Sequence, residues 1–235
     1  QSDVMIYDDL MYRHWDAWED GKFSHIFLYE GNEAVGVDIM EGEPYNCPTT
    51  PFGGEEDYTW SPDGKQIVYV AKKKAGSEYA VSTNPDLYVY DVESGKTSNL
   101  TEGMMGYDTH PVFATTGALA WLSMKRDGYE ADKNDIFAKL GSTTINLTRD
   151  WDGTVNSFVW KQDGSGLYFN AAVDGTIQLF EVDHPGKTKK KPVVHQITQG
   201  DFDVRGLVGI TGDVMIVSRT DMNHASELFS VNLSD

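Results

Sequence analysis

The most informative segment of the sequence is Tyr58-Thr59-Trp60-Ser61-Pro62-Asp63-Gly64-Lys65-Gln66-Ile67-Val68-Tyr69-Val70. It predicts a short strand, a tight turn and a second strand in which polar and apolar residues alternate. Pro62 presets the φ angle of the second turn position, Asp63 can hydrogen-bond to its own backbone, and Gly64 adopts positive φ without a Cβ penalty. The stretch is therefore interpreted as a β-hairpin.

The hairpin pattern returns along the chain with a period of roughly fifty residues, in the range typical of propellers rather than helical solenoids. Its later copies are residues 109–122, 157–169 and 206–217. A second motif recurs with about the same period, at residues 99–103, 146–150 and 196–200. Each unit holds about four strand-like runs separated by Gly, Pro, Asn or Asp, and no long stretch has the apolar spacing of an amphipathic helix.

These repeats predict an all-β fold, a β-propeller arc of about four blades of four antiparallel strands that is incomplete at both ends. Residues 24–29 and 36–39 resemble the last two strands of a blade, and no fourth strand follows residues 229–233. The chain is therefore interpreted as part of a larger protein. The predicted blades are residues 1–50 (the end of one blade), 51–103, 104–150, 151–200 and 201–235 (an incomplete blade).

The composition excludes several function classes. Thirty-seven acidic against nineteen basic residues give a formal net charge of −18, which repels the phosphate backbone of nucleic acids. Cys47 is the single cysteine, so neither a disulfide framework nor a thiolate metal cluster is expected, and the six histidines lack the spacing of metal ligands. Neither a metal nor a cofactor is predicted. No run has the length of a membrane span, and no signal peptide opens the sequence at Gln1.

The connections between the second and third strands of the units are the most charged, and an antiparallel blade would place them on one face. They are residues 13–22, 71–85, 125–134, 171–175 and 219–226. Because functional residues tend to lie on loops that a rigid scaffold holds, we expect any site on that face.

Several of these segments resemble the propeller half of the prolyl oligopeptidase family of serine peptidases, particularly its dipeptidyl-peptidase branch. The carriers are Arg13-His14-Trp15-Asp16, Trp60-Ser61-Pro62-Asp63-Gly64-Lys65, Ser82-Thr83-Asn84-Pro85-Asp86-Leu87-Tyr88 and Arg126-Asp127-Gly128-Tyr129-Glu130-Ala131-Asp132. The resemblance implies a periplasmic or secreted dipeptidyl peptidase whose propeller gates access and anchors the substrate N-terminus. The reaction would belong to a separate C-terminal α/β-hydrolase domain with a Ser, Asp and His triad.

The chain itself is expected to be inactive. It contains no Gly-x-Ser-x-Gly motif, and no catalytic residue is predicted within it. The alternative is a TolB-like propeller that binds a protein partner and performs no chemistry, since lone TolB-like propellers also use the Trp-Ser-Pro-Asp-Gly-Lys hairpin.

In the family an acidic side chain of the propeller holds the protonated N-terminus of the peptide substrate. The resemblance implies that Glu130 takes this role here, with Tyr129, Asp132 and Arg126 beside it in the substrate-binding site. A carboxylate–ammonium hydrogen bond is charge-assisted and short, which suits such an anchor. The alternative is structural: Glu130 or Asp132 pairs with Arg126 or Lys133 and stiffens the loop.

Other segments have two interpretations each. Residues 13–16 could line the same cavity or hold two blades together, and the second is favoured. Glu55-Glu56 is similar to the paired glutamates of some dipeptidyl peptidases, but it directly precedes a first strand and is interpreted as a linker between repeats. Asn99, Asn146 and Asn232 match glycosylation acceptors. The first two lie at the repeated blade junction, which favours a structural role for them.

Overall fold

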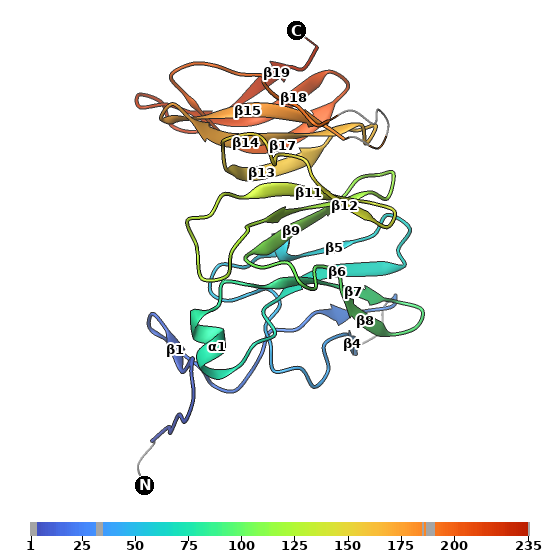
Figure 1. The fold of residues 1–235 in the computed structure, drawn as a ribbon, viewed down its shortest axis with the longest axis vertical. Helices are drawn as coiled ribbons and strands as arrows, with labels where there is room; N and C mark the ends of the chain where they lie inside the picture. The colour runs from blue at the N-terminus through green and yellow to red at the C-terminus, as the bar shows by residue number, and fades with distance from the viewer. Residues whose placement is uncertain (1–3, 32–34, 185, 187–190, 235) are drawn as a thin grey trace. The chain divides into compact units, whose positions relative to one another are not determined.

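The computed structural model describes residues 4–31, 35–184, 186 and 191–234. Within these residues β-strands dominate, and the helices are short: the six-residue α1 (Gly76–Val81) and the three-residue 3-10 helix η1 (Glu55–Asp57). The all-β class predicted from the repeated hairpins is therefore confirmed (Figure 1).

The strands form successive sheets in which strands that follow one another in the chain are neighbours (Figure 1). The first described sheet of four strands consists of β5 (Tyr58–Trp60), β6 (Gln66–Ala71), β7 (Asp86–Asp91) and β8 (Lys96–Asn99). The second consists of β9 (Asp108–Phe113), β10 (Leu119–Ser123), β11 (Asp135–Leu140) and β12 (Thr143–Asn146). The third consists of β13 (Val155–Trp160), β14 (Gly166–Val173), β15 (Thr176–Asp183) and β16 (Val194–Gln196). A sheet of three strands follows: β17 (Asp203–Thr211), β18 (Val214–Thr220) and β19 (Glu227–Asn232).

These are the four-stranded antiparallel sheets expected of propeller blades. In the first, Gln66 of β6 lies opposite Asp91 of β7, and Ala71 lies opposite Asp86. Each of the four larger sheets lies inside one of the ranges predicted from the repeat. The blade boundaries themselves stay a prediction.

The turn between β5 and β6 forms as its residue types predict. Gly64 has φ +69°, and its N–H donates to the carbonyl oxygen of Ser61 at 2.9 Å. Asp63 Oδ1 accepts hydrogen bonds from Ser61 Oγ at 2.7 Å and from the Lys65 N–H at 3.1 Å. The turn between β13 and β14 repeats the arrangement, because Gly164 has φ +68° and donates to the Lys161 carbonyl at 2.9 Å. The repeat seen in the sequence is thus a repeat of local hydrogen bonding.

The second repeated motif is a network of half-buried Asp and Asn side chains around a buried Thr. Thr101 Oγ1 accepts the Leu87 N–H at 3.0 Å and donates to Asp86 Oδ1 at 3.2 Å, and Asn99 Nδ2 donates to Asp86 Oδ2 at 2.9 Å. The residues that repeat these bonds in the next sheet are Asp135, Asn146, Thr148 and Ile136. The Asn side chains at both acceptor motifs are therefore engaged within the fold.

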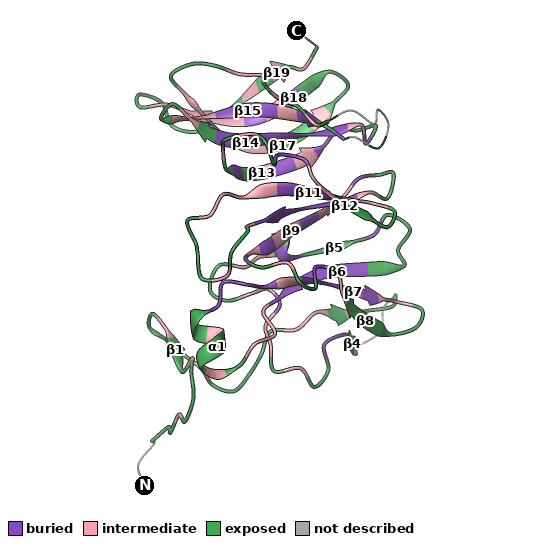
Figure 2. Cartoon of the chain, viewed as in Figure 1, coloured by how far each residue is buried: buried purple, intermediate pink, exposed green. Residues whose placement is uncertain are grey.

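The chain divides into two compact units. The first comprises residues 1–111 and 124–132, and the second comprises residues 112–123 and 133–235. The first has its core where Ile67, Tyr69 and Tyr88 pack against residues 39–47. In the second, Phe158 and Phe169 belong to a cluster of buried side chains. Figure 2 shows the burial concentrated in inner strands such as β6 and β14, with edges such as β8 exposed.

The N-terminal strands are shorter than predicted. Residues 24–29 and 36–39 contribute two-residue strands, β3 (Phe27–Leu28) and β4 (Val37–Asp38). Backbone groups beside β3 bond elsewhere, because the Ser24 carbonyl accepts the Cys47 N–H at 2.8 Å. The imidazole of His25 contacts Asp38 Oδ2 at 2.7 Å and the Glu43 carbonyl at 2.9 Å. Side chains and a following loop thus replace part of the strand pairing.

Candidate functional site

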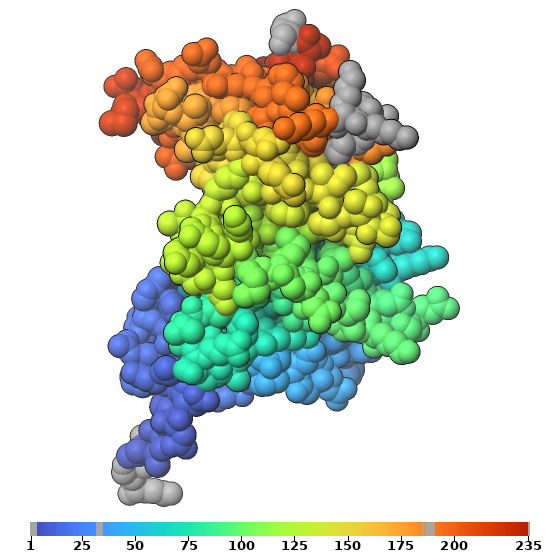
Figure 3. Space-filling view, in the orientation of Figure 1, coloured from blue at the N-terminus to red at the C-terminus, as the bar shows by residue number. Residues whose placement is uncertain are grey.

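A cavity of about 600 Å³ opens in the first unit, and every residue that lines it belongs to that unit. The N-terminal hairpin contributes Met11, His14 and Glu19. The other lining residues are Thr49, Thr50, Pro51, Phe52, Lys72, Tyr79, Ala80, Val81, Ser82, Thr83, Pro85, Tyr107, Gly128, Tyr129, Glu130 and Ala131. In Figure 3 the N-terminal segment, in blue, lies against the α1 region, in blue-green, on this unit's surface. Three of the charged connections named from the sequence therefore meet at one cavity.

Helix α1 forms one wall, and Lys72 fixes its C-terminal end. Lys72 Nζ donates to the carbonyl oxygens of Tyr79 at 2.9 Å and Ser82 at 3.1 Å, and it lies 3.9 Å from the centre of the Tyr79 ring. These bonds satisfy carbonyls that a helix leaves unpaired at its C-terminus. Burial lowers the pKa of Lys72, although Asp127 and Glu130 nearby oppose the shift. The ammonium group is thus occupied by the wall that it stabilises.

Glu130 lines the cavity with its carboxylate available. Its side chain is exposed, and no described residue forms an ion pair or hydrogen bond with this carboxylate. Its electrostatic effect reaches Tyr107, whose pKa is raised by burial first and by Glu130 second. The Tyr79 and Tyr129 side chains line the same space. A carboxylate in a cavity with aromatic walls is suited to bind a cationic group.

Asp132 and Arg126 pair with each other. Arg126 Nε lies 3.0 Å from each carboxylate oxygen of Asp132, and Arg126 Nη2 donates a further bond to Asp132 Oδ1. The hydrogen bond with Arg126 lowers the pKa of Asp132, and the same bond raises the pKa of Arg126. The Arg126 guanidinium also lies 3.9 Å from the centre of the Tyr129 ring. Of the residues predicted for the site, Glu130 and Tyr129 line the cavity, whereas Asp132 and Arg126 join the two ends of their loop.

The N-terminal hairpin belongs to the site more closely than the sequence interpretation favoured. The strands β1 (Arg13–His14) and β2 (Ala17–Trp18) bring His14 to the cavity, and Glu19 follows directly after β2. The Trp15 ring contacts the Phe52 ring edge-on at 5.7 Å. The resemblance named this cluster, but the pattern of residues carried no signal for Glu19.

The paired glutamates lie outside the cavity lining. Glu55 and Glu56 form η1 with Asp57, directly before β5, where the sequence placed them. Asp57 is buried and accepts hydrogen bonds from the Thr49 N–H and Thr49 Oγ1, both at 2.7 Å. Burial raises the pKa of Asp57, against the opposing effect of these bonds. Asp57 thus holds Thr49 at the cavity wall, a role that the sequence did not indicate.

Neither a metal-binding cluster nor a membrane-spanning helix is found among the described residues. No group of three or more His, Cys, Asp and Glu side chains in the described ranges is placed to hold a metal ion. No helix in the part of the chain that the structure describes is long and apolar enough to cross a membrane.

Comparison with known proteins identifies the relatives. No family model matches the chain. Dipeptidyl-peptidase 5 of Porphyromonas gingivalis is 42% identical over 97% of the chain, and the match covers 33% of that protein. Dipeptidyl-peptidase 5 of Porphyromonas endodontalis is 40% identical, again over 97% of the chain and 33% of the relative. This chain is a homologue of dipeptidyl-peptidase 5. It spans about one third of the length of these relatives.

Solved structures agree on the fold of this chain. A putative dipeptidyl aminopeptidase IV from Bacteroides ovatus superposes with a TM-score of 0.58 at 17% identity, over 76% of the chain and 32% of that structure. The β-propeller domain of the Trilobed protease from Pyrococcus furiosus gives a TM-score of 0.53 at 14% identity, over 76% and 54%. At these identities the likeness shows the propeller fold alone.

Proposed function

We propose that this chain is the propeller part of a serine dipeptidyl peptidase and that Glu130 binds the protonated N-terminus of the peptide substrate. The identity of 42% to dipeptidyl-peptidase 5 along nearly the whole chain supports the activity. A C-terminal α/β-hydrolase domain of the same protein would supply the nucleophile and its base. The substrate would be a peptide with a free N-terminus, and the protein would act in the periplasm or outside the cell.

The observation that carries the proposal is that the Glu130 carboxylate lines the cavity without a bonding partner among the described residues. Lys72 lines the cavity but is bonded to two carbonyl oxygens, and Arg126 is bonded to Asp132. Within the described loop, Glu130 is therefore the carboxylate left available to a ligand. A ligand ammonium would form a charge-assisted hydrogen bond with it, and this bond strengthens as the ligand displaces water.

The cavity also fits the end of a peptide in size and character. Its volume of about 600 Å³ lies within the range of small-molecule sites. Tyr79, Tyr107 and Tyr129 line the cavity, and such aromatic residues can pack against a side chain of the peptide. Once a bound peptide displaces water, a blocked N-terminus would leave the Glu130 carboxylate without a charged donor, so the site would select free amines.

The TolB-like alternative has weaker support. A putative TolB from Agrobacterium tumefaciens shares the fold, with a TM-score of 0.55 at 16% identity, over 75% of the chain and 61% of that structure. This likeness concerns the fold alone, whereas dipeptidyl-peptidase 5 is related in sequence over almost every residue.

Substitution of Glu130 in the full-length protein tests the proposal. Losing a hydrogen bond to a charged partner costs about 1.5–3 kcal/mol, so Glu130→Gln should lower kcat/KM for a free-amine dipeptidyl nitroanilide about 10- to 150-fold. Glu93→Gln is the matched control, since Glu93 is exposed in the turn between β7 and β8 and does not line the cavity.

Asp132→Asn, which weakens the ion pair with Arg126, should have a much smaller effect than Glu130→Gln. The N-acetylated substrate should be poor for the unmodified protein. Equal and small effects of Glu130→Gln and Asp132→Asn would remove Glu130 from the site.

A further inference from the structure

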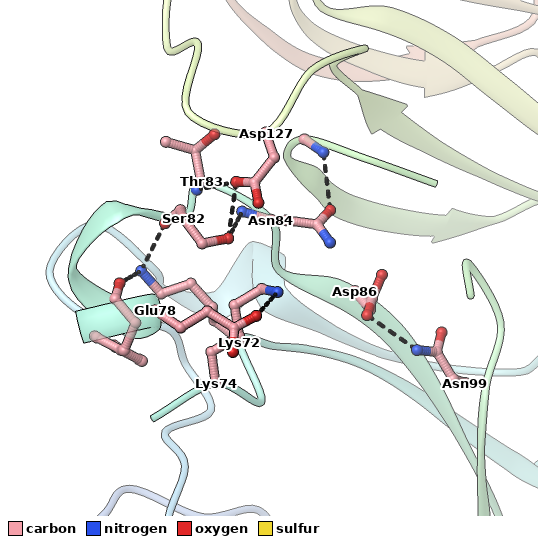
Figure 4. Close-up of polar contacts among 11 residues, drawn as sticks. Lys72, Lys74, Glu78, Ser82, Thr83, Asn84, Asp86, Asn99 and Asp127 are labelled. Atoms are coloured by element: carbon pink, nitrogen blue, oxygen red, sulfur yellow. Dashed lines mark hydrogen bonds and ion pairs between the residues drawn. The ribbon is translucent and has the colours of Figure 1, made fainter. Parts of the chain in front are cut away.

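Two sequence segments that lie 45 residues apart are joined by hydrogen bonds beside the cavity. Asp127 Oδ1 accepts hydrogen bonds from Ser82 Oγ at 2.8 Å and from the Thr83 N–H at 2.7 Å. In return, Thr83 Oγ1 accepts the Gly128 N–H at 2.8 Å. We call these three bonds the Asp127 clasp; Figure 4 shows the first two meeting at the Asp127 carboxylate.

The residues on the Ser82 side of the clasp are buried and held in place themselves. Ser82, Thr83 and Asn84 are each less than a tenth exposed. Ser82 Oγ accepts the Asn84 N–H at 3.2 Å, and Asn84 Oδ1 accepts the Gly106 N–H at 2.8 Å (Figure 4). A buried polar network of this kind is rigid when every member has a partner. Residues 82–84 thus form a fixed platform between α1 and β7.

The bonds from this platform end next to the cavity. Asp127 and Gly128 directly precede Tyr129 and Glu130, and Gly106 directly precedes Tyr107. Because Glu130 has no partner among the described residues, its position depends on the backbone that carries it. That backbone is held at one end by the Asp127 clasp, and at the other the Asp132 N–H donates to the Tyr129 carbonyl at 3.2 Å.

We infer that Asp127 is a positioning residue for substrate binding, which fixes residues 128–131 so that Glu130 presents its carboxylate to the cavity. Asp127 itself does not line the cavity, so it acts through Glu130 rather than on the ligand. The part of this inference that concerns an amine ligand rests on the function proposed above. The part that concerns the position of residues 128–131 stands on the hydrogen bonds alone.

Replacing Asp127 distinguishes a role that depends on its hydrogen bonds from a role that depends on its charge. Partial burial raises the pKa of Asp127, but hydrogen bonds, led by the one from Ser82, together with the charge of Lys74 lower the pKa overall. An asparagine at this position keeps an oxygen that can accept the same two bonds, and an alanine does not. If position is what matters, Asp127→Asn retains function and Asp127→Ala loses it.

The experiment measures KM, kcat and amide hydrogen exchange for Asp127→Ala, Asp127→Asn, Glu130→Gln and the double variant Asp127→Ala/Glu130→Gln in the full-length protein. For a free-amine dipeptidyl nitroanilide, Asp127→Ala should raise KM about tenfold, as expected for a misplaced binding group, with kcat little changed. Asp127→Asn should restore most of the affinity. The amides of residues 128–131 should exchange faster than in the unmodified protein in Asp127→Ala, but not in Asp127→Asn.

The double variant separates a positioning role from general destabilisation. If Asp127 acts through Glu130, the double variant should have the KM of Glu130→Gln, because the two changes are not additive. Additive effects would overturn the inference, as would an Asp127→Asn variant as impaired as Asp127→Ala. Ser82→Ala removes one clasp bond and provides a milder variant if Asp127→Ala folds poorly.

The outcomes also distinguish this inference from the proposed function. A normal KM in Glu130→Gln together with fast exchange in Asp127→Ala would refute the amine-binding role and support the positioning of residues 128–131. Unchanged exchange and unchanged KM in Asp127→Ala would refute the positioning role, whatever Glu130→Gln shows.

Discussion

Replacing Gly106 by alanine would place a methyl group against the backbone that leads into the Glu130 loop. Gly106 has φ +108°, which disfavours every residue with a Cβ atom. A Cβ atom there would lie 2.9 Å from the Met124 carbonyl oxygen and 3.1 Å from the Arg126 nitrogen. Both contacts are with backbone atoms, so neither can be relieved by rotating a side chain.

Two costs add up at this position. A non-glycine residue held at such a φ costs of order 1–3 kcal/mol. Overpacking against fixed atoms costs about 1–3 kcal/mol more. The free energy of unfolding should therefore fall by about 2–6 kcal/mol in Gly106→Ala. The Gly106 N–H also donates to Asn84 Oδ1, so a backbone shift that relieves the contact would weaken that bond.

Gly103→Ala is the matched control for the crowding. Gly103 has φ +86°, and no atom lies within 4 Å of the point that a Cβ atom would occupy, so this substitution carries only the conformational cost. Urea unfolding of both variants, followed by tryptophan fluorescence, should give the lower midpoint for Gly106→Ala. The free energies of unfolding of the two variants should differ by about 1–3 kcal/mol. Equal midpoints would refute the claim that Met124 and Arg126 crowd this position.

Two further outcomes follow from buried groups. Thr148→Val should destabilise the protein by about 1–3 kcal/mol, because the Ile136 N–H loses its acceptor; Thr144→Val, at an exposed position of β12, should change stability little in the same unfolding assay. Burial raises the pKa of the Cys47 thiol to about 12, so iodoacetamide at neutral pH should label Cys47 after unfolding and not before. Since the unfolded thiol ionises near pH ~8.5, stability should fall as the pH rises from about 8.5 towards 12, and Cys47→Ala should reduce this fall.

Local signals explain why the repeated sheets could be predicted from the sequence. A turn such as Ser61 to Gln66 is specified by residues that are neighbours in the chain, so Asp63 and Gly64 predict it directly. Helix α1 gave no such signal, since six residues are too few for a helical period, and its last turn is held by Lys72 from the end of β6.

The candidate site, too, could be predicted from the sequence only in part. The resemblance named Glu130, Tyr129, Asp132 and Arg126 as one group, and the sequence left open whether Asp132 would bind substrate or pair with Arg126. Only the folded chain decides this, because the ion pair depends on how the loop closes. The same holds for Glu19, which reaches the cavity through the hairpin of β1 and β2.

By itself the sequence determined the all-β fold, its repeat and the loop that carries Glu130, because turns and strand alternation depend on near neighbours in the chain. The tertiary structure alone decided which carboxylate of the described loop faces the cavity unpaired and that Ser82 and Thr83 hold Asp127. Such bonds join residues 44 and 45 positions apart, and their geometry exists only once the backbone between them has folded.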